Sequence, residues 1–166
     1  MQDEAPEIEA TGRALLYQHG VGLGFLATVG ADGSPRVHPM CPLLHEAGIF
    51  AFIIPSPKQR DLHRDGRYAM HSYPREDDED AFFLAGLAAH VQDPDIRHAL
   101  SDQFVAERAQ FDVPAPAADH HLFEFDISRC LTTKTAGHGD SNPRKLVWHA
   151  QPTADAGRGN ESTSRP

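Results

Sequence analysis

The sequence predicts a mainly β fold of the α+β class, an antiparallel barrel with a few peripheral helices. Apolar segments of strand length outnumber helical ones, in the order helix, three strands, short helix, two strands, helix, two strands. Connections of the hairpin type dominate, and they favour antiparallel pairing over the long crossovers that a parallel sheet needs. A chain of 166 residues fits one domain with its own core.

The first quarter of the chain predicts a helix followed by a β-hairpin. Residues 7–19 carry apolar side chains at helical spacing. Residues 21–29 (VGLGFLATV) then form an apolar strand, which we expect to be buried on both faces. The Asp32-Gly33 pair predicts a turn into a second strand, Pro35 to Met40. Since Pro39 has no N–H for a ladder, we expect this strand to lie at a sheet edge or to contain a bulge.

The next segment predicts a strand that runs into a short, charged helix. Residues 49–54 (IFAFII) are uniformly apolar, and we expect this strand to lie centrally in the sheet. Ser56 is the expected helix N-cap, and Gln59 completes a capping box with it. Pro57 suits the first helical turn, and Gly66 ends the helix.

The rest of the domain predicts four more strands and one more helix. The strands are expected at 68–73, 81–91 (with a bend at Gly86), 123–128 and 146–150. The helix, capped by Asp93, places Ile96, Leu100 and Phe104 on one face. The acidic run 76–80 is expected to be a solvated loop. We therefore expect a single domain at 1–150. Residues 151–166 carry no large apolar side chain and are expected to form a disordered polar tail.

Composition and charge narrow the class of function. The net charge of −9 argues against nucleic acid as a partner, because phosphates would be repelled. No stretch approaches the roughly 20 apolar residues of a membrane span, so no membrane partner is expected. The acidic start, MQDEAPEIEA, is unlike a signal peptide, and the only two cysteines, Cys41 and Cys130, have no metal or redox spacing. These features predict a cytoplasmic protein.

The start of the predicted helix near Pro57 is the best candidate for chemistry. A helix N-terminus offers backbone N–H groups and a partial positive charge, which together favour an anion. Ser56 adds a hydroxyl group and Lys58 a full positive charge at the same place. This pattern predicts a phosphate seat, and the alternative is an ordinary capped helix with a surface lysine.

Two segments carry a family resemblance. IFAFIIPSPKQRDLHRDGRYAMHS resembles the central signature of the pyridoxamine 5'-phosphate oxidase-like flavoproteins: an apolar strand, a Ser-x-Lys turn, a charged helix and another apolar strand. FLATVGADGSPRVHPM is similar to the first two strands of that family, and the resemblance covers about residues 13–150. It implies a homodimeric split β-barrel that holds FMN in a groove between subunits. It also implies an oxidoreductase acting on a small-molecule substrate or electron donor.

The resemblance also implies which residues contact the cofactor. Lys58 matches the lysine at the FMN phosphate, and Ser56 lies in the same turn. The remaining matches are Arg36, Val37 and His38 on the strand that lines the flavin, Ile53 and Ile54 at the end of the third strand, and Trp148 as an aromatic near the flavin. For Trp148 the alternative is a core tryptophan on the last strand.

The chain also departs from the family pattern. Pro57 stands where pyridoxamine phosphate oxidases carry an arginine, and the end RKLVWHA has no equivalent of their Arg-x-His element. Vitamin B6 oxidation is therefore not expected. The alternatives are a deazaflavin-dependent reductase and a non-catalytic carrier or sensor of flavin or haem. No residue is assigned as general acid or base. No metal site is assigned, because none of the 11 histidines has HExxH or similar spacing.

Overall fold

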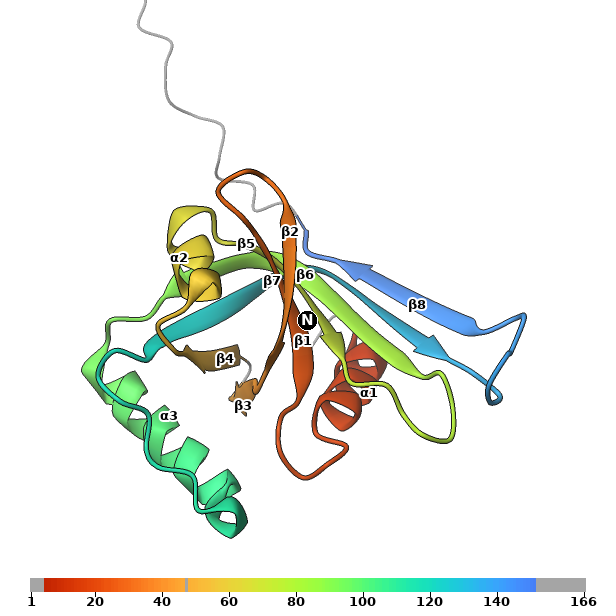
Figure 1. Ribbon diagram of the computed structural model, residues 1–166. Coiled ribbons are helices and arrows are strands. Elements are labelled where there is room, and N and C mark those ends of the chain that lie inside the picture. Colours follow the sequence, from red (N-terminus) through yellow and green to blue (C-terminus); the bar gives the residue numbers. More distant parts are fainter. Residues whose placement is uncertain (1–4, 47, 152–166) are drawn as a thin grey trace, which may run out of the picture.

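The computed structural model describes residues 5–46 and 48–151, so the predicted tail lies outside the described residues except for Gln151. In this part of the chain eight strands form one curled antiparallel sheet with helices at its margins (Figure 1). The strands are β1 (Gly24–Val29), β2 (Pro35–Met40), β3 (Leu43–His45), β4 (Gly48–Ile53), β5 (Arg67–Ser72), β6 (Ala81–His90), β7 (His121–Lys134) and β8 (Arg144–His149). The helices are α1 (Pro6–Leu16), α2 (Pro57–Arg64) and α3 (Pro94–Glu107), with a 3₁₀ turn at Ala109–Phe111. The predicted fold class is confirmed.

The long strand β7 organises the sheet. The strand order is β2-β1-β5-β6-β7-β4-β3, and β8 also pairs with β7. The first residues of β7 pair with β4, with His121 opposite Ile53, and its last residues pair with β8, with Cys130 opposite Trp148. Elements attached to β4 and elements attached to β8 therefore lie at opposite ends of the same strand, as Figure 1 shows for α2 and β8.

One prediction about strand environment is wrong and another holds only in part. The first strand is not buried on both faces: its residues alternate, with Leu26 fully buried and its neighbours Phe25 and Ala27 only half-buried. The reason is that the main core packs against only one face of β1, the face that carries Leu26. The strand at 49–54 is interior, since β4 pairs with β7 on one side and with β3 on the other, but it lies next to the sheet edge that the short strand β3 forms. A three-residue strand leaves too weak a pattern to predict.

Two other local predictions are confirmed. The strand that contains Pro39 lies at the other edge of the sheet, where a missing N–H costs no ladder bond. The β6–β7 register shifts between Ala85 and Gly86, which is the expected bend. A Cβ atom at position 86 would lie 1.9 Å from the carbonyl oxygen of Asp126, so the close approach of the two strands requires glycine.

The helices cover different parts of the sheet. α1 packs against β5, β6 and β7 through buried Ile8, Leu15 and Leu16. In α3, Leu100 is fully buried, but Ile96 is 40% exposed, so only part of the predicted face packs. The apolar cluster beneath α3 is small, so it covers only part of the helix face. Its buried members are Leu43, Phe50, Leu100 and Leu122. None of the helices in the described ranges is both long and apolar enough to cross a membrane.

The acidic run lies in the connection between β5 and β6, but its last residue is not solvated as expected. Asp80 is buried, and its Oδ1 accepts a hydrogen bond from the backbone N–H of Thr135 (2.7 Å). Its Oδ2 lies 3.6 Å from the Lys134 Nζ. Asp80 therefore joins this loop to the end of β7, and the acidic run has a structural role.

Candidate functional site at the start of helix α2

The turn from β4 into α2 is held by its own polar side chains. The Ser56 hydroxyl donates to the Ile54 carbonyl (2.8 Å) and accepts from the backbone N–H of Gln59 (3.4 Å), which confirms the predicted N-cap. The expected return bond of a capping box is replaced. The Gln59 side-chain amide donates instead to the carbonyls of Ile53 (2.7 Å) and Asp119 (2.9 Å). These bonds fix the first turn of α2 against the ends of β4 and β7.

Lys58 lies beside this turn and reaches across to β2. The side chain is half-buried, and its Nζ donates to the Pro39 carbonyl (3.2 Å). Burial lowers the pKa of Lys58, and the nearby Cys41 thiol opposes that shift. An ammonium group has three N–H donors, of which the Pro39 contact takes one. A partly desolvated cation with further donors suits an anion better than the same group in open solvent.

His38 faces the same space from β2. Its Nε2 is buried and has no hydrogen-bond partner among the described residues. Burial lowers the pKa of His38, the positive charges of Lys58 and Arg36 lower it further, and Asp61 opposes them. The ring is therefore neutral at pH 7. A buried polar atom without a partner is costly, so this nitrogen is suited to a group that a bound molecule supplies.

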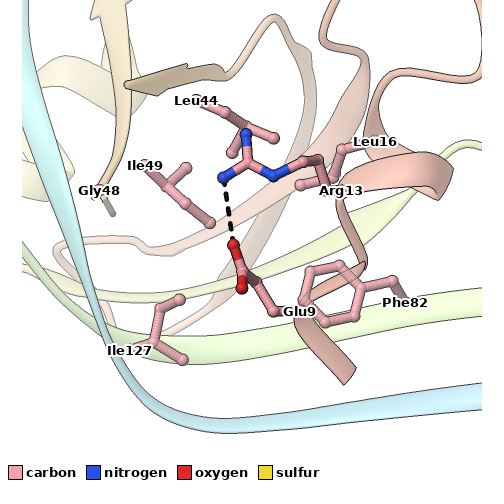
Figure 2. A pocket seen from close by; sticks show the side chains of 8 residues that line it. All are labelled: Glu9, Arg13, Leu16, Leu44, Gly48, Ile49, Phe82 and Ile127. Carbon is pink, nitrogen blue, oxygen red and sulfur yellow. Dashed lines mark hydrogen bonds and ion pairs between the residues drawn. The ribbon is translucent and has the colours of Figure 1, made fainter. Parts of the chain in front are cut away.

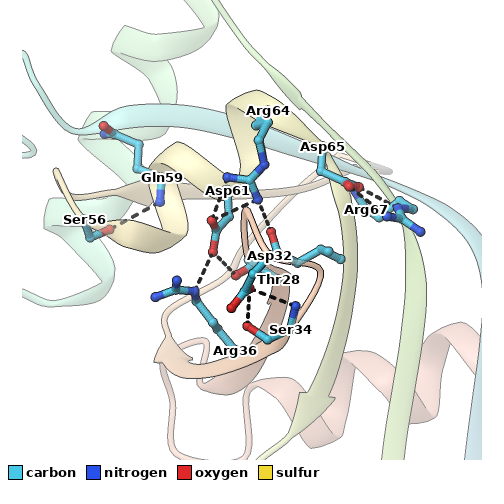
Figure 3. A network of polar contacts seen from close by, with 11 residues as sticks. Thr28, Asp32, Ser34, Arg36, Ser56, Gln59, Asp61, Arg64, Asp65 and Arg67 are labelled. Carbon is cyan, nitrogen blue, oxygen red and sulfur yellow. Dashed lines mark hydrogen bonds and ion pairs between the residues drawn. The ribbon is translucent and has the colours of Figure 1, made fainter.

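Asp61 fixes α2 against the β1–β2 hairpin (Figure 3). The carboxylate is only 4% exposed, and it accepts a hydrogen bond from the Thr28 hydroxyl (3.0 Å). Arg36 and Arg64 approach it from opposite sides, at 3.4 Å and 3.1 Å. Arg64 also donates to the carbonyl of Val29. The sequence reasoning missed Asp61, although a carboxylate on the buried face of so short a helix is a signal that could have found it.

The structure brings together only some of the predicted cofactor residues. Arg36, His38, Ser56 and Lys58 surround the start of α2 together with the end of β4 at Ile53 and Ile54. Val37 points to the other face of β2 and is 65% exposed. Trp148 lies on β8, at the far end of β7, and packs against the main core. Within one chain, neither Val37 nor Trp148 joins this group.

A small pocket elsewhere does not compete with this site. It lies between α1 and the sheet, and its volume is about 30 Å³ (Figure 2). Its walls are apolar side chains such as Leu16, Ile49 and Phe82, with the Arg13–Glu9 ion pair (3.2 Å) beside them. A volume of this size holds about one water molecule. The pocket is therefore too small for a cofactor.

Comparisons with known proteins identify the fold. No protein-family model and no curated protein sequence matches the chain. Among solved structures, a haem-binding protein from Mycobacterium smegmatis aligns with a TM-score of 0.62 and 18% identity over 84% of this chain. The alignment covers 57% of that protein, so this chain spans little more than half of its length.

Two further structures match over nearly their whole length. General stress protein 26 from Bacillus anthracis aligns with a TM-score of 0.60 and 15% identity over 86% of this chain and 99% of that one. A Clostridium acetobutylicum protein of the pyridoxinephosphate oxidase family, related to general stress protein 26, aligns with a TM-score of 0.61 and 13% identity over 88% of this chain and 96% of that one. Such identities show the fold alone. The chain has the split β-barrel fold of the pyridoxamine 5'-phosphate oxidase-like proteins, as the sequence predicted.

Proposed function

We propose that this protein binds FMN and acts as a flavin-dependent oxidoreductase on a small molecule, with the phosphate at the start of α2. The observation that carries the proposal is the pairing of Lys58 with His38, a half-buried cation beside a buried ring nitrogen to which no described residue offers a hydrogen bond. Both face a helix N-terminus, which adds partial positive charge. The fold shared with a pyridoxinephosphate oxidase family protein supports the choice of a flavin.

The residues present fit this cofactor. Lys58 and Ser56 would hold the phosphate, and the orphaned Nε2 of His38 is a partner for a polar atom of the flavin. Ile54, 51% exposed at the end of β4, offers an apolar contact to the ring system. FMN supplies hydride or electron transfer when it is bound, and the chain positions it and tunes its electrostatics. Because Pro57 stands where pyridoxamine phosphate oxidases carry an arginine, we do not propose vitamin B6 as the substrate.

A second copy of the chain is the proposed partner, because the outer face of the sheet is apolar. Across five neighbouring strands the outward side chains follow one row. The row consists of Phe25, His71, Phe83, Leu131 and Val147. Val147 is 57% exposed, and Phe25, Phe83 and Leu131 are each half-buried. This strip is apolar except for His71, which is exposed. A row of apolar side chains across five strands is typical of an interface, and a two-fold dimer is the commonest way to cover it.

Light scattering at micromolar concentration should therefore give about twice the chain mass of 18.2 kDa. Phe83→Glu places a charge in the centre of the strip and should give a monomer. Gln92→Glu, in the exposed segment after β6, is the matched control and should stay dimeric. A wild type that is strictly monomeric contradicts both the dimer and a cofactor groove between subunits.

Haem is the second candidate ligand, in a carrier or sensor rather than an enzyme. One structural neighbour is a haem-binding protein, and a neutral histidine nitrogen such as His38 Nε2 is a common ligand of haem iron. A deazaflavin in place of FMN is the third candidate ligand. It would use the same phosphate seat at Lys58.

An absorption spectrum of the purified protein, loaded separately with each cofactor, distinguishes these proposals. FMN should give a yellow complex, whereas haem would give a Soret band and a deazaflavin would absorb nearer the violet. Turnover with NAD(P)H then separates an oxidoreductase from a carrier. A protein that takes up haem and leaves FMN free would overturn the flavin proposal.

A further inference from the structure

Three histidines that are far apart in the sequence meet beside α2. His63 lies in the last turn of α2, His90 ends β6 and His121 begins β7. Their ring centroids form a nearly equilateral triangle, with separations of 4.9 Å (His63–His90), 4.9 Å (His63–His121) and 4.8 Å (His90–His121). The Nε2 of His63 lies 2.6 Å from the Nδ1 of His121, so these two nitrogens share one proton. This histidine triangle is independent of the cofactor proposal.

The surroundings favour neutral imidazole rings, which is the form that binds metal ions. Partial burial and the neighbouring rings lower the pKa of His63 and of His90, and the positive charge of Arg97 lowers that of His90 further. Buried Phe123 packs beneath the triangle, with its ring 4.9 Å from His63 and 5.6 Å from His90. The packing on Phe123 therefore holds the rings close together, and the lowered pKa values of His63 and His90 favour the neutral form of these two rings, which binds metal ions.

We propose that His63, His90 and His121 bind a divalent transition metal of the zinc class. Zinc takes imidazole nitrogens at about 2.0–2.1 Å in tetrahedral geometry, which sets the centroids of two coordinated rings about 5 Å apart. The observed separations of 4.8–4.9 Å agree with this spacing. His63 is exposed, so the fourth position faces solvent and water can fill it.

Binding requires small side-chain movements. As the described residues stand, no group of three His, Cys, Asp or Glu side chains is arranged to hold a metal ion. The His63–His121 nitrogens must part from 2.6 Å to about 3.3 Å. The donor ring must also change tautomer, its proton moving to its other nitrogen, so that both neutral rings offer an electron pair to the metal. His90, now stacked on His121 at 28°, must turn its edge toward the other two rings. Both movements are changes in the side-chain torsion angles of rings that are at least partly exposed.

Calorimetric titration of the whole chain with Zn²⁺ tests the site. One ion per chain is expected, together with a rise in melting temperature, because the metal ties α2 to β6 and β7. His63→Gln, His90→Gln and His121→Gln should each weaken Zn²⁺ at least tenfold, since each removes one ligand. His98→Gln is the matched control: its side chain is 82% exposed on α3, and its loss should leave Zn²⁺ binding unchanged.

Cobalt provides a readout that needs no variant. Co²⁺ bound by three nitrogens and a water in tetrahedral geometry should show intense visible bands, and Zn²⁺ should abolish them. Zn²⁺ binding that survives His90→Gln overturns the three-ligand site. A pale Co²⁺ complex, which indicates octahedral coordination, overturns it as well. Since FMN is absent from both experiments, failure of the flavin proposal would not affect either result.

Discussion

Replacing Lys58 by alanine should weaken FMN binding about ten- to hundredfold while the protein stays folded. The ammonium group lies beside the N-terminus of α2 and is half-buried, so water competes for it less than at an open surface. A charge-assisted contact to phosphate contributes about 1.5–3 kcal/mol in such a place. Fluorescence titration of the two proteins with FMN measures the difference.

The control for Lys58→Ala is Arg60→Ala. Arg60 is exposed on the same short helix, and its loss changes the net charge by the same amount. If position matters and not overall charge, only the Lys58 variant loses affinity. Equal losses of FMN affinity in the two variants would mean that the phosphate binds elsewhere, or that Lys58 acts on it only through long-range electrostatic attraction.

Asp61→Asn should lower the free energy of unfolding by about 3 kcal/mol. The buried carboxylate accepts from Thr28 and lies within 3.4 Å of Arg36 and 3.1 Å of Arg64. An amide removes the negative charge that both guanidinium groups face, and it offers one acceptor oxygen instead of two. Since the two arginines are partly exposed, the loss lies at the low end of the range for a broken buried pair. Urea denaturation measures it.

Asp65→Asn is the matched control for Asp61→Asn. Asp65 is the C-cap of the same helix, and its partner Arg67 has a side chain that is 67% exposed. Ion pairs of that kind contribute little, so the urea midpoint should stay close to that of the wild type. Should the Asp61 variant also unfold at the wild-type midpoint, the carboxylate would not be what fixes α2 to the β1–β2 hairpin.

Features with local signals could be predicted from the sequence. The Asp32-Gly33 turn produces the β1–β2 hairpin, with Gly33 at a positive φ of 82°. Ser56 caps α2, and Asp93 caps α3 by accepting from the N–H groups of Asp95 and Ile96. In each case a few adjacent residues determine the geometry, so their identities carry the information.

Features that depend on distant pairing could not be predicted in this way. β3 was missed because three residues carry too little pattern, although its pairing with β4 is what keeps β4 from being the sheet edge. The contact of Asp61 with Thr28 spans 33 residues, and no spacing in the sequence marks it. The histidine triangle depends in the same way on the placement of α2 beside the β6–β7 pair.

The central claim is that the start of α2 binds the phosphate of a flavin cofactor. Parallel titrations of the wild type with FMN and with riboflavin, which lacks the phosphate, test it most directly. FMN should bind at least ten times more tightly, and Lys58→Ala should bring the two affinities close together by weakening FMN alone. Equal binding of FMN and riboflavin to the wild type, or binding of neither, would contradict the claim.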